Sequence, residues 1–108
     1  MNSREKGKRG ERELAQELAR FGFKTRRGQQ YNGADGSADV VGIPGLHIEC
    51  KRVEQLNLEK ALQQAENDAK AGELPAVFHR KNREDWKVTI RLKDFVWLWR
   101  RRRDHGEY

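Results

Sequence analysis

Residues 38–51, ADVVGIPGLHIECK, decide the fold of this 108-residue chain. The run ADVVGI is rich in β-branched side chains, the IPG at 43–45 is typical of a turn, and LHIECK alternates between apolar and polar residues. The second strand therefore has an apolar side and a polar side, which consist of Leu46, Ile48 and Cys50, and of His47, Glu49 and Lys51. The pattern predicts a β-hairpin with one face in the core and one polar face.

Two acidic residues stand in this hairpin, where acids are unusual. Asp39 opens the first strand and Glu49 lies within the second. A loop of three residues (43–45) or five (42–46) would pair Asp39 directly with Glu49, whereas an even loop would place them on opposite faces. Paired residues have Cβ atoms about 4.5–5.5 Å apart. Carboxylates at that distance repel each other unless one is protonated or a cation lies between them, and Mg²⁺ suits such a site.

The remaining segments alternate between helical and extended patterns. We expect helices over 6–21 and 57–71 and a last helix from about Asp94, strands over 23–27, 75–81 and 86–92, and a loop over the glycine-rich residues 28–36. The order α, β, β, β, α, β, β, α predicts an α/β domain with a mixed sheet and helices on both faces. At this length, we expect residues 1–108 to form a single domain.

Composition narrows the functional classes. The chain has 23 Lys and Arg against 17 Asp and Glu, a net charge of +6, which favours a polyanionic partner. The single cysteine, Cys50, excludes an internal disulfide and a multi-cysteine zinc site, and we expect it to be buried. No apolar run approaches the roughly 20 residues of a membrane span. The basic N-terminus lacks the apolar stretch of a secretory signal, so we expect a soluble, cytoplasmic protein.

Glu11 is a third acid in a notable position. It falls on the helical row of Leu14, Ala15 and Leu18, so it points toward the sheet from the N-terminal end of the buried stripe. The alternative is that Glu11 only complements the helix dipole.

Together these residues resemble the PD-(D/E)XK nuclease superfamily, through Glu11, Asp39 and the run Glu49-Cys50-Lys51. The stretch GERELAQELARFGF, residues 10–23, is similar to the first helix of archaeal-type Holliday junction resolvases. Arg27 matches the arginine that ends the next strand in that family, and Gly36 and Ser37 lead to the aspartate as there. The first motif reads S-A-D, without the usual proline. The resemblance implies a restriction-endonuclease-like αβββαβ core, here with an extra C-terminal strand and helix.

The resemblance also implies a Mg²⁺-dependent endonuclease that hydrolyses phosphodiester bonds in branched DNA. Asp39, Glu49 and the backbone carbonyl of Cys50 would bind Mg²⁺, with Mn²⁺ as a substitute, and Glu11 would bind through water or hold a second ion. Lys51 would orient the attacking water and offset charge on the phosphate. Gln63 would position water or Lys51. An alternative for Glu49 and Lys51 is an exposed ion pair on the strand face.

Basic residues around this face are candidates for phosphate contacts. The expected DNA-binding residues are Lys6, Lys8, Arg9, Arg12, Arg26 and Arg27, together with Ser37 and with Tyr31 as a stacking residue. The loop 28–36 is either a clamp on DNA or a plain loop. The run Arg100–Arg103 is either a solvated tail or a further DNA contact. His47 and His79 lack metal-ligand spacing and are expected to be structural or to face DNA.

Two symmetric cuts in a junction require two sites, so a homodimer is expected. Trp97 and Trp99 lie either in the core or at such an interface. Two other functions remain open: a phage or mobile-element nuclease that cuts other branched or duplex DNA, in which case the compartment is the host cytoplasm, and a catalytically inactive DNA-binding domain with the nuclease fold.

Overall fold

The computed structural model describes residues 3–28 and 38–104. Their elements are α1 (Ser3–Arg20), β1 (Arg26–Arg27), β2 (Val40–Val41), β3 (Leu46–Arg52), α2 (Leu58–Asp68), β4 (Leu74–Arg80), β5 (Lys87–Thr89) and α3 (Leu92–Asp104). This order confirms the expected αβββαβ core with an additional strand and helix. Strands β1 and β5 are shorter than the sequence pattern suggested, and α3 begins two residues before Asp94.

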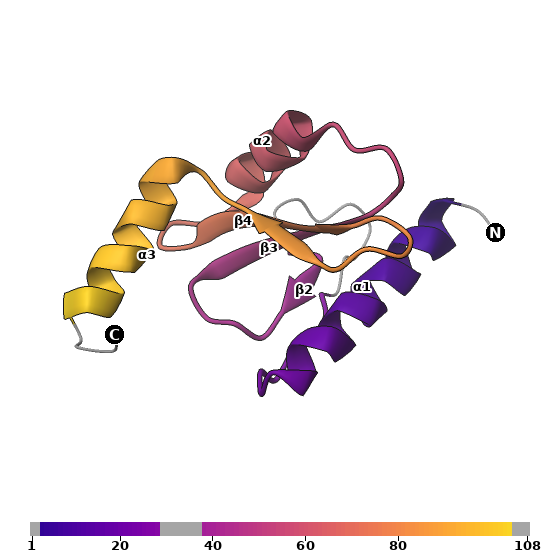
Figure 1. The fold of residues 1–108 in the computed structure, drawn as a ribbon, viewed down its shortest axis with the longest axis horizontal. Helices are drawn as coiled ribbons and strands as arrows, with labels where there is room; N and C mark the ends of the chain where they lie inside the picture. Colours follow the sequence, from indigo (N-terminus) through magenta and orange to yellow (C-terminus); the bar gives the residue numbers. More distant parts are fainter. Residues whose placement is uncertain (1–2, 29–37, 105–108) are drawn as a thin grey trace.

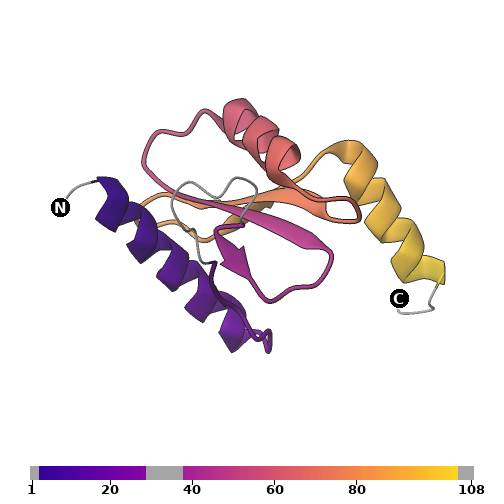
Figure 2. The same cartoon turned by 180° about the vertical axis from the view of Figure 1, so that it is seen from behind.

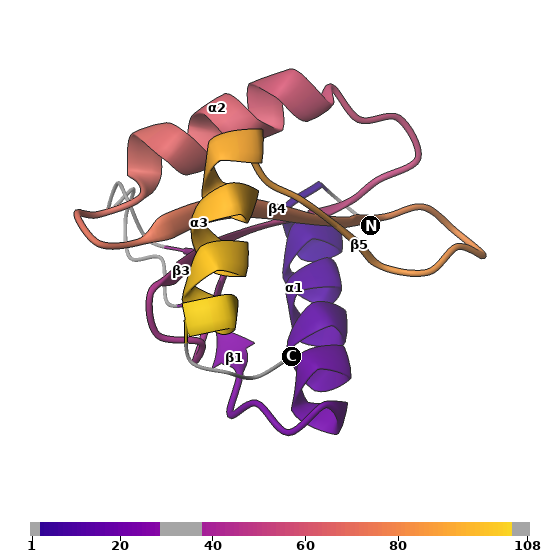
Figure 3. The ribbon, with the colours of Figure 1, turned by 60° about the vertical axis from the view of Figure 1, so that its left-hand side comes forward.

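The strands form one mixed sheet in the order β1-β2-β3-β4-β5. Strands β3 and β4 are parallel and are joined through α2, while the other neighbours are antiparallel. Helices α1 and α2 cover opposite faces of the sheet, as Figures 1 and 3 show. The expected α/β architecture, with a mixed sheet flanked by helices, is therefore confirmed.

The core consists of two layers on either side of the sheet. On one face, the apolar stripe of α1 packs against the sheet. The stripe consists of Leu14, Ala15 and Leu18, and the sheet contributes Val40, Ile48, Ala76 and Phe78. On the other face, α2 packs through Ala61, Leu62, Ala65 and Val77. Asn57 caps α2, because its side chain accepts a 3.0 Å hydrogen bond from the Lys60 N–H.

The polar side of β3 is not a solvated face, which corrects the expectation for the hairpin. Helix α2 covers this side, so His47 and Glu49 are buried, and only Lys51 at the end of the strand is partly exposed. The period-two pattern gave the correct alternation, and helices were expected on both faces of the sheet, but the pattern did not indicate that α2 would bury His47 and Glu49.

The hairpin has the register that pairs the two acids. Val40 pairs with Ile48 across β2 and β3, which places Asp39 opposite Glu49 and leaves the three-residue turn Ile43–Gly45. Gly45 adopts a φ of +82°, as a three-residue hairpin turn requires at its last position. The expectation of an odd loop is confirmed.

One glycine lets α1 approach the sheet closely. A Cβ atom on Gly10 would lie 2.6 Å from the Cβ of Arg52 at the end of β3, a distance that real Cβ contacts do not show. Gly7, one turn earlier in α1, has open space at the same point. Gly10 therefore brings the N-terminal half of α1 beside the end of β3.

Helix α3 extends from the sheet at the end of the molecule opposite the start of α1 (Figure 1). Within the described part of the chain none of its side chains is buried. Trp97 is 53% exposed and Trp99 is 43% exposed, so neither is a core residue here. Arg101 lies over the Trp97 ring at 4.9 Å, and the rings of Phe95 and Trp99 stack at 6.1 Å. The run Arg100–Arg103 is helical and exposed, in agreement with the solvated reading, and its contact with DNA stays a prediction.

Candidate active site

The expected acids meet in one cavity of about 780 Å³ between α1 and the C-terminal half of β3. Five of the predicted catalytic and metal-binding residues line it, and they come from α1, the start of the hairpin and β3: Glu11, Asp39, Glu49, Cys50 and Lys51. They are separated by up to 40 positions in the sequence, and the hairpin register together with the close approach at Gly10 brings them together.

Asp39 is buried at the edge of β2. Its Oδ2 accepts a 2.8 Å hydrogen bond from the N–H of Cys50 on the neighbouring strand. Burial, followed by the charge of Glu49, raises the pKa of Asp39 from 3.8 to about 7, and Glu11 adds to this shift although the hydrogen bond from Cys50 opposes it. The carboxyl group thus lies in a negative, poorly solvated environment that a cation would relieve.

Glu49 is buried beneath α2, and its two oxygens face different neighbours. Oε2 lies 3.8 Å from Lys51 Nζ, two residues along the same side of β3. Oε1 lies 3.7 Å from Nε2 of the buried His47. The alternative of a solvent-exposed ion pair does not describe Glu49, because only Lys51 of the two is appreciably exposed.

Glu11 reaches the cavity from α1 and is held by an arginine from β1. Arg27 Nε donates a 3.0 Å hydrogen bond to Glu11 Oε1, and both side chains are largely shielded from solvent. Glu11 therefore has a fixed partner from the sheet and does not act only on the helix dipole. The pair also gives Arg27 a definite position at the rim of the acidic cluster.

Helix α2 contributes a glutamine one position away from the expected one. Gln64 lines the cavity, and Lys51 Nζ donates to its Oε1 at 3.5 Å. Gln63 is exposed and its Nε2 lies 3.5 Å from Glu59 Oε1, so it is not brought to the site. The two glutamines flank the same apolar stripe, and the residue pattern alone does not distinguish them.

Part of the expected DNA-binding set borders the cavity. Lys6 and Arg9 line it, whereas Lys8, Arg12 and Arg26 do not. Tyr31 and Ser37 lie outside the described residues, as does most of the loop 28–36. The basic end of α3 lies far from α1 at the other end of the molecule, as Figure 2 shows from behind. The run Arg100–Arg103 therefore does not contribute to the cavity.

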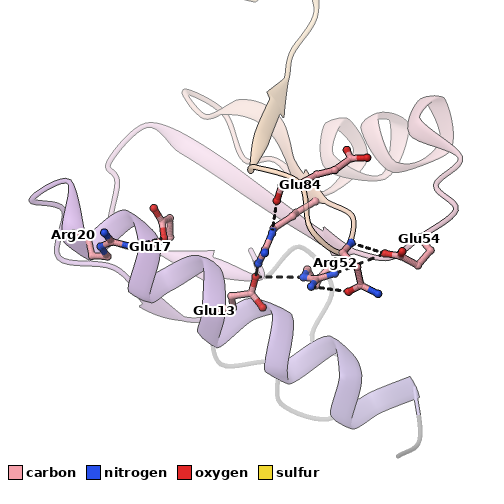
Figure 4. Close-up of polar contacts among 8 residues, drawn as sticks. Glu13, Glu17, Arg20, Arg52, Glu54 and Glu84 are labelled. Carbon is pink, nitrogen blue, oxygen red and sulfur yellow. Dashed lines mark hydrogen bonds and ion pairs between the residues drawn. The ribbon is translucent and has the colours of Figure 1, made fainter.

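A charged network beside the cavity was not expected from the sequence. Arg80 and Arg52 both donate to Glu13 Oε1, the latter at 3.3 Å, so one carboxylate of α1 joins the ends of β3 and β4. Arg52 Nη1 also lies 3.9 Å from Glu54 Oε2, and Arg52 Nη2 donates a 2.9 Å hydrogen bond to Asn82 Oδ1 (Figure 4). The network joins α1, β3, β4 and the loops that follow the two strands, and a local sequence pattern carries no signal for it.

The remaining candidate residues have packing roles. Burial and the neighbouring acids, Asp39 foremost among them, raise the pKa of the Cys50 thiol well above its usual range. The thiol therefore stays protonated and packs against the α1 side of the core. His79 lies 2.8 Å from the Thr89 hydroxyl in a hydrogen bond between β4 and β5, which agrees with a structural role.

Comparison with known proteins agrees with this geometry. The family model described as "Phage putative PDDEXK endonuclease" matches residues 2–105. The chain belongs to this family. It is thus an endonuclease of the PD-(D/E)XK type, a hydrolase of a class that generally depends on a divalent metal ion. None of the curated proteins matches its sequence.

Among solved structures, this PD-(D/E)XK endonuclease is similar to Hjc of Archaeoglobus fulgidus, a Holliday junction resolvase from an archaeal hyperthermophile. The two are 27% identical, with a TM-score of 0.61, and the match covers 76% of this chain and 74% of the other. The likeness confirms the resolvase-like fold. No helix in the described ranges is long and apolar enough to cross a membrane.

Proposed function

We propose that this endonuclease hydrolyses phosphodiester bonds in branched DNA with Mg²⁺, as a homodimer. The observation that carries the proposal is the convergence of Glu11, Asp39 and Glu49 with Lys51 in one open cavity. The preference for branched DNA is supported by the similarity to a Holliday junction resolvase. The phage family supports the cytoplasm of a host cell as the compartment.

The donor set fits a hard divalent cation. Asp39 and Glu49 offer adjacent carboxylates. Burial, followed by the charge of Glu49, raises the pKa of Asp39, and a bound cation would offset both effects. Asp39, Glu49 and the Cys50 carbonyl would hold Mg²⁺ directly, while Glu11 would act through water or hold a second ion. When bound, Mg²⁺ supplies a Lewis acid that polarises the phosphoryl group and acidifies water.

The surrounding side chains orient the reaction. Lys51 places an ammonium between Glu49 and Gln64, where it can position a water molecule and offset charge that develops on the phosphate. We assign to Gln64 the supporting role that the sequence suggested for Gln63. Arg27 fixes Glu11, and the Cys50 N–H fixes one oxygen of Asp39.

Phosphate contacts are proposed for the cationic rim of the cavity. Lys6 and Arg9 lie on the same part of α1 as Glu11, so a strand that enters the site passes along them. Such contacts position DNA but do not read its sequence.

The homodimer is proposed to form through α3. Its exposed large apolar side chains are Leu92, Phe95, Trp97, Leu98 and Trp99. The helix is also self-complementary in charge, with Asp94 in its first turn and Arg101–Arg103 in its last. An antiparallel pair of α3 helices centred near Leu98 would set Asp94 of each copy against Arg102 of the other, and a two-fold axis generates this arrangement.

The test is incubation of the purified chain and Mg²⁺ with a four-way junction, a flap and a linear duplex of the same sequence. Paired nicks in the junction alone support the proposal. Equal cutting of all three would instead support a phage nuclease that acts on general DNA. Asp39→Asn is the control for the site: it should bind DNA without cutting it, and residual cutting would show that the assigned site is wrong.

A further inference from the structure

We infer that His47, Glu49 and Asp68 form a second metal site, which takes a divalent transition metal such as Zn²⁺. The site lies on the α2 side of the sheet, between β3 and the end of α2. One ligand atom from each of the three residues lies within 4.8 Å of the others. Glu49 is shared with the proposed Mg²⁺ site, but the other two residues have no part in it.

His47 provides the observation that points to a ligand. Its side chain is completely buried, and among the described residues neither ring nitrogen has a hydrogen-bond partner. A buried polar group without a partner destabilises the folded state, so such groups are rare unless something else satisfies them. Neutral imidazole is the commonest metal ligand among side chains, and a bound ion would satisfy His47.

The two ring nitrogens face carboxylates in a way that suits metal binding. Nε2 lies 3.7 Å from Glu49 Oε1, slightly more than the roughly 3.4 Å between neighbouring ligands of a tetrahedral zinc ion. On the opposite side of the ring, Nδ1 lies 3.8 Å from Glu73 Oε1. A metal-bound histidine generally donates its second N–H to such a carboxylate, which fixes the tautomer.

The donor set favours a transition metal over Mg²⁺. One imidazole nitrogen with two carboxylates suits Zn²⁺ and its neighbours, whereas Mg²⁺ prefers oxygen ligands alone. The two oxygens of Glu49 face different groups: Oε1 faces His47 at the inferred site, and Oε2 faces Lys51, which lines the cavity of the proposed Mg²⁺ site. The inferred site does not depend on Asp39 or on DNA cleavage.

The experiment isolates this site by using the Asp39→Asn chain, in which the proposed Mg²⁺ site is disabled. The protein is stripped with EDTA, dialysed and titrated calorimetrically with Zn²⁺ in excess Mg²⁺. Co²⁺ in place of Zn²⁺ gives a visible absorption readout. We expect one Zn²⁺ per chain, retained against Mg²⁺. No binding, or equal displacement by Mg²⁺, would overturn the inference.

Substitutions in the same background locate the ion. His47→Gln and Asp68→Ala should each weaken Zn²⁺ binding at least tenfold, and Glu73→Gln about tenfold as a supporting group. His79→Gln is the matched control, because its ring already contacts Thr89, and it should change nothing. If circular dichroism shows that His47→Gln is unfolded, Asp68→Ala decides, since Asp68 is only partly buried at the end of α2.

The test of the second metal site, by Zn²⁺ binding, can fail independently of the test of the proposed function, by DNA cleavage. Unchanged Zn²⁺ affinity in Asp68→Ala would overturn the second metal site while leaving DNA cleavage by the wild-type chain unaffected. Zn²⁺ binding by a chain that does not cut DNA would instead support the second metal site and contradict the proposed function.

Discussion

The main-chain N–H of Cys50 donates a hydrogen bond to the carboxylate of Asp39 across the hairpin. This contact ties the first acid of the site to the strand that carries the second acid and the lysine. It holds one carboxylate oxygen in place although burial and the charge of Glu49 oppose ionisation. The position of Asp39 is therefore set by the strand pairing itself.

Asp39→Asn should stabilise the metal-free protein, with a pH dependence of definite sign. Because the pKa of Asp39 is raised from 3.8 to about 7, the folded chain binds more protons than the unfolded chain between these values. The free energy of unfolding of the wild type therefore falls as pH rises through this window, by about 1.4 kcal/mol per unit of pKa shift. The difference in free energy of unfolding between Asp39→Asn and the wild type should therefore grow in favour of the variant from about pH 4 to about pH 7.

Urea unfolding in EDTA at a series of pH values measures this difference. The asparagine can still accept the hydrogen bond from Cys50, so little else changes. Asp85→Asn, at an exposed position in the β4–β5 turn, is the matched control. A stability difference that does not vary with pH would contradict the assigned environment of Asp39.

Lys51→Ala should lower the cleavage rate by about 10²–10³-fold, since it removes a preorganised cation from the site of developing charge. Binding of Mg²⁺ should be preserved, because Lys51 is not one of the proposed ligands. Single-turnover cleavage together with calorimetry of Mg²⁺ binding measures both effects. Lys87→Ala, on β5 and paired with Glu84, serves as the control and should cut normally. A parallel loss of metal binding would assign Lys51 a structural role instead.

Gly10→Ala should destabilise the fold, and Gly7→Ala should stabilise it. Alanine is favoured over glycine in a helix by about 0.5–1 kcal/mol, which is the gain expected at the open position 7. At position 10 the new methyl group would collide with Arg52, so α1 must move away from β3. Thermal unfolding compares the two variants, which lie one turn apart in α1. Equal effects would mean that the close approach is absent.

The double variant Lys6→Ala, Arg9→Ala should bind DNA more weakly and with a shallower salt dependence. Each phosphate contact contributes about −0.9 to the slope of log affinity against log salt on duplex DNA, so two lost contacts reduce the slope by about 2. Fluorescence anisotropy at several salt concentrations measures it. The double variant Arg100→Ala, Arg103→Ala removes the same charge from α3. An identical response there would show that only net charge matters.

Phe95→Arg should dissociate the proposed dimer without loss of fold, because Phe95 is half exposed in the single chain. Light scattering after size exclusion measures the mass. Phe21→Arg alters an even more exposed phenylalanine, at the end of α1, and should leave the mass unchanged. A monomeric wild type would refute the dimer, and a Phe95→Arg dimer would refute pairing through α3.

The sequence predicted most of the fold because the deciding signals are local. The alternation over 46–51 and the turn at 43–45 predicted the hairpin. An odd number of residues in that turn places Asp39 and Glu49 on the same face of the sheet, and the structure has an odd turn. The helical row that contains Glu11 likewise predicted that its side chain points toward the sheet. These features depend on the spacing of apolar residues along one helix or strand, so they can be predicted from a single sequence.

What the sequence did not predict depends on how separate elements pack. The choice of Gln64 over Gln63 follows from the rotation of α2 relative to β3, which neither glutamine encodes. The burial of His47 follows from the coverage of a polar strand face by α2. The exposure of α3 follows from the absence of a facing element within the described chain.

The turn at residues 43–45 contains no acidic residue, yet its length sets the register that places Asp39 opposite Glu49. Insertion of one codon there would rotate Asp39 to the reverse side of the ribbon and should abolish cleavage as completely as removing the aspartate. Insertion of two codons would restore the parity. The odd length of a short bend without catalytic groups is thus as necessary to the proposed site as the acids themselves.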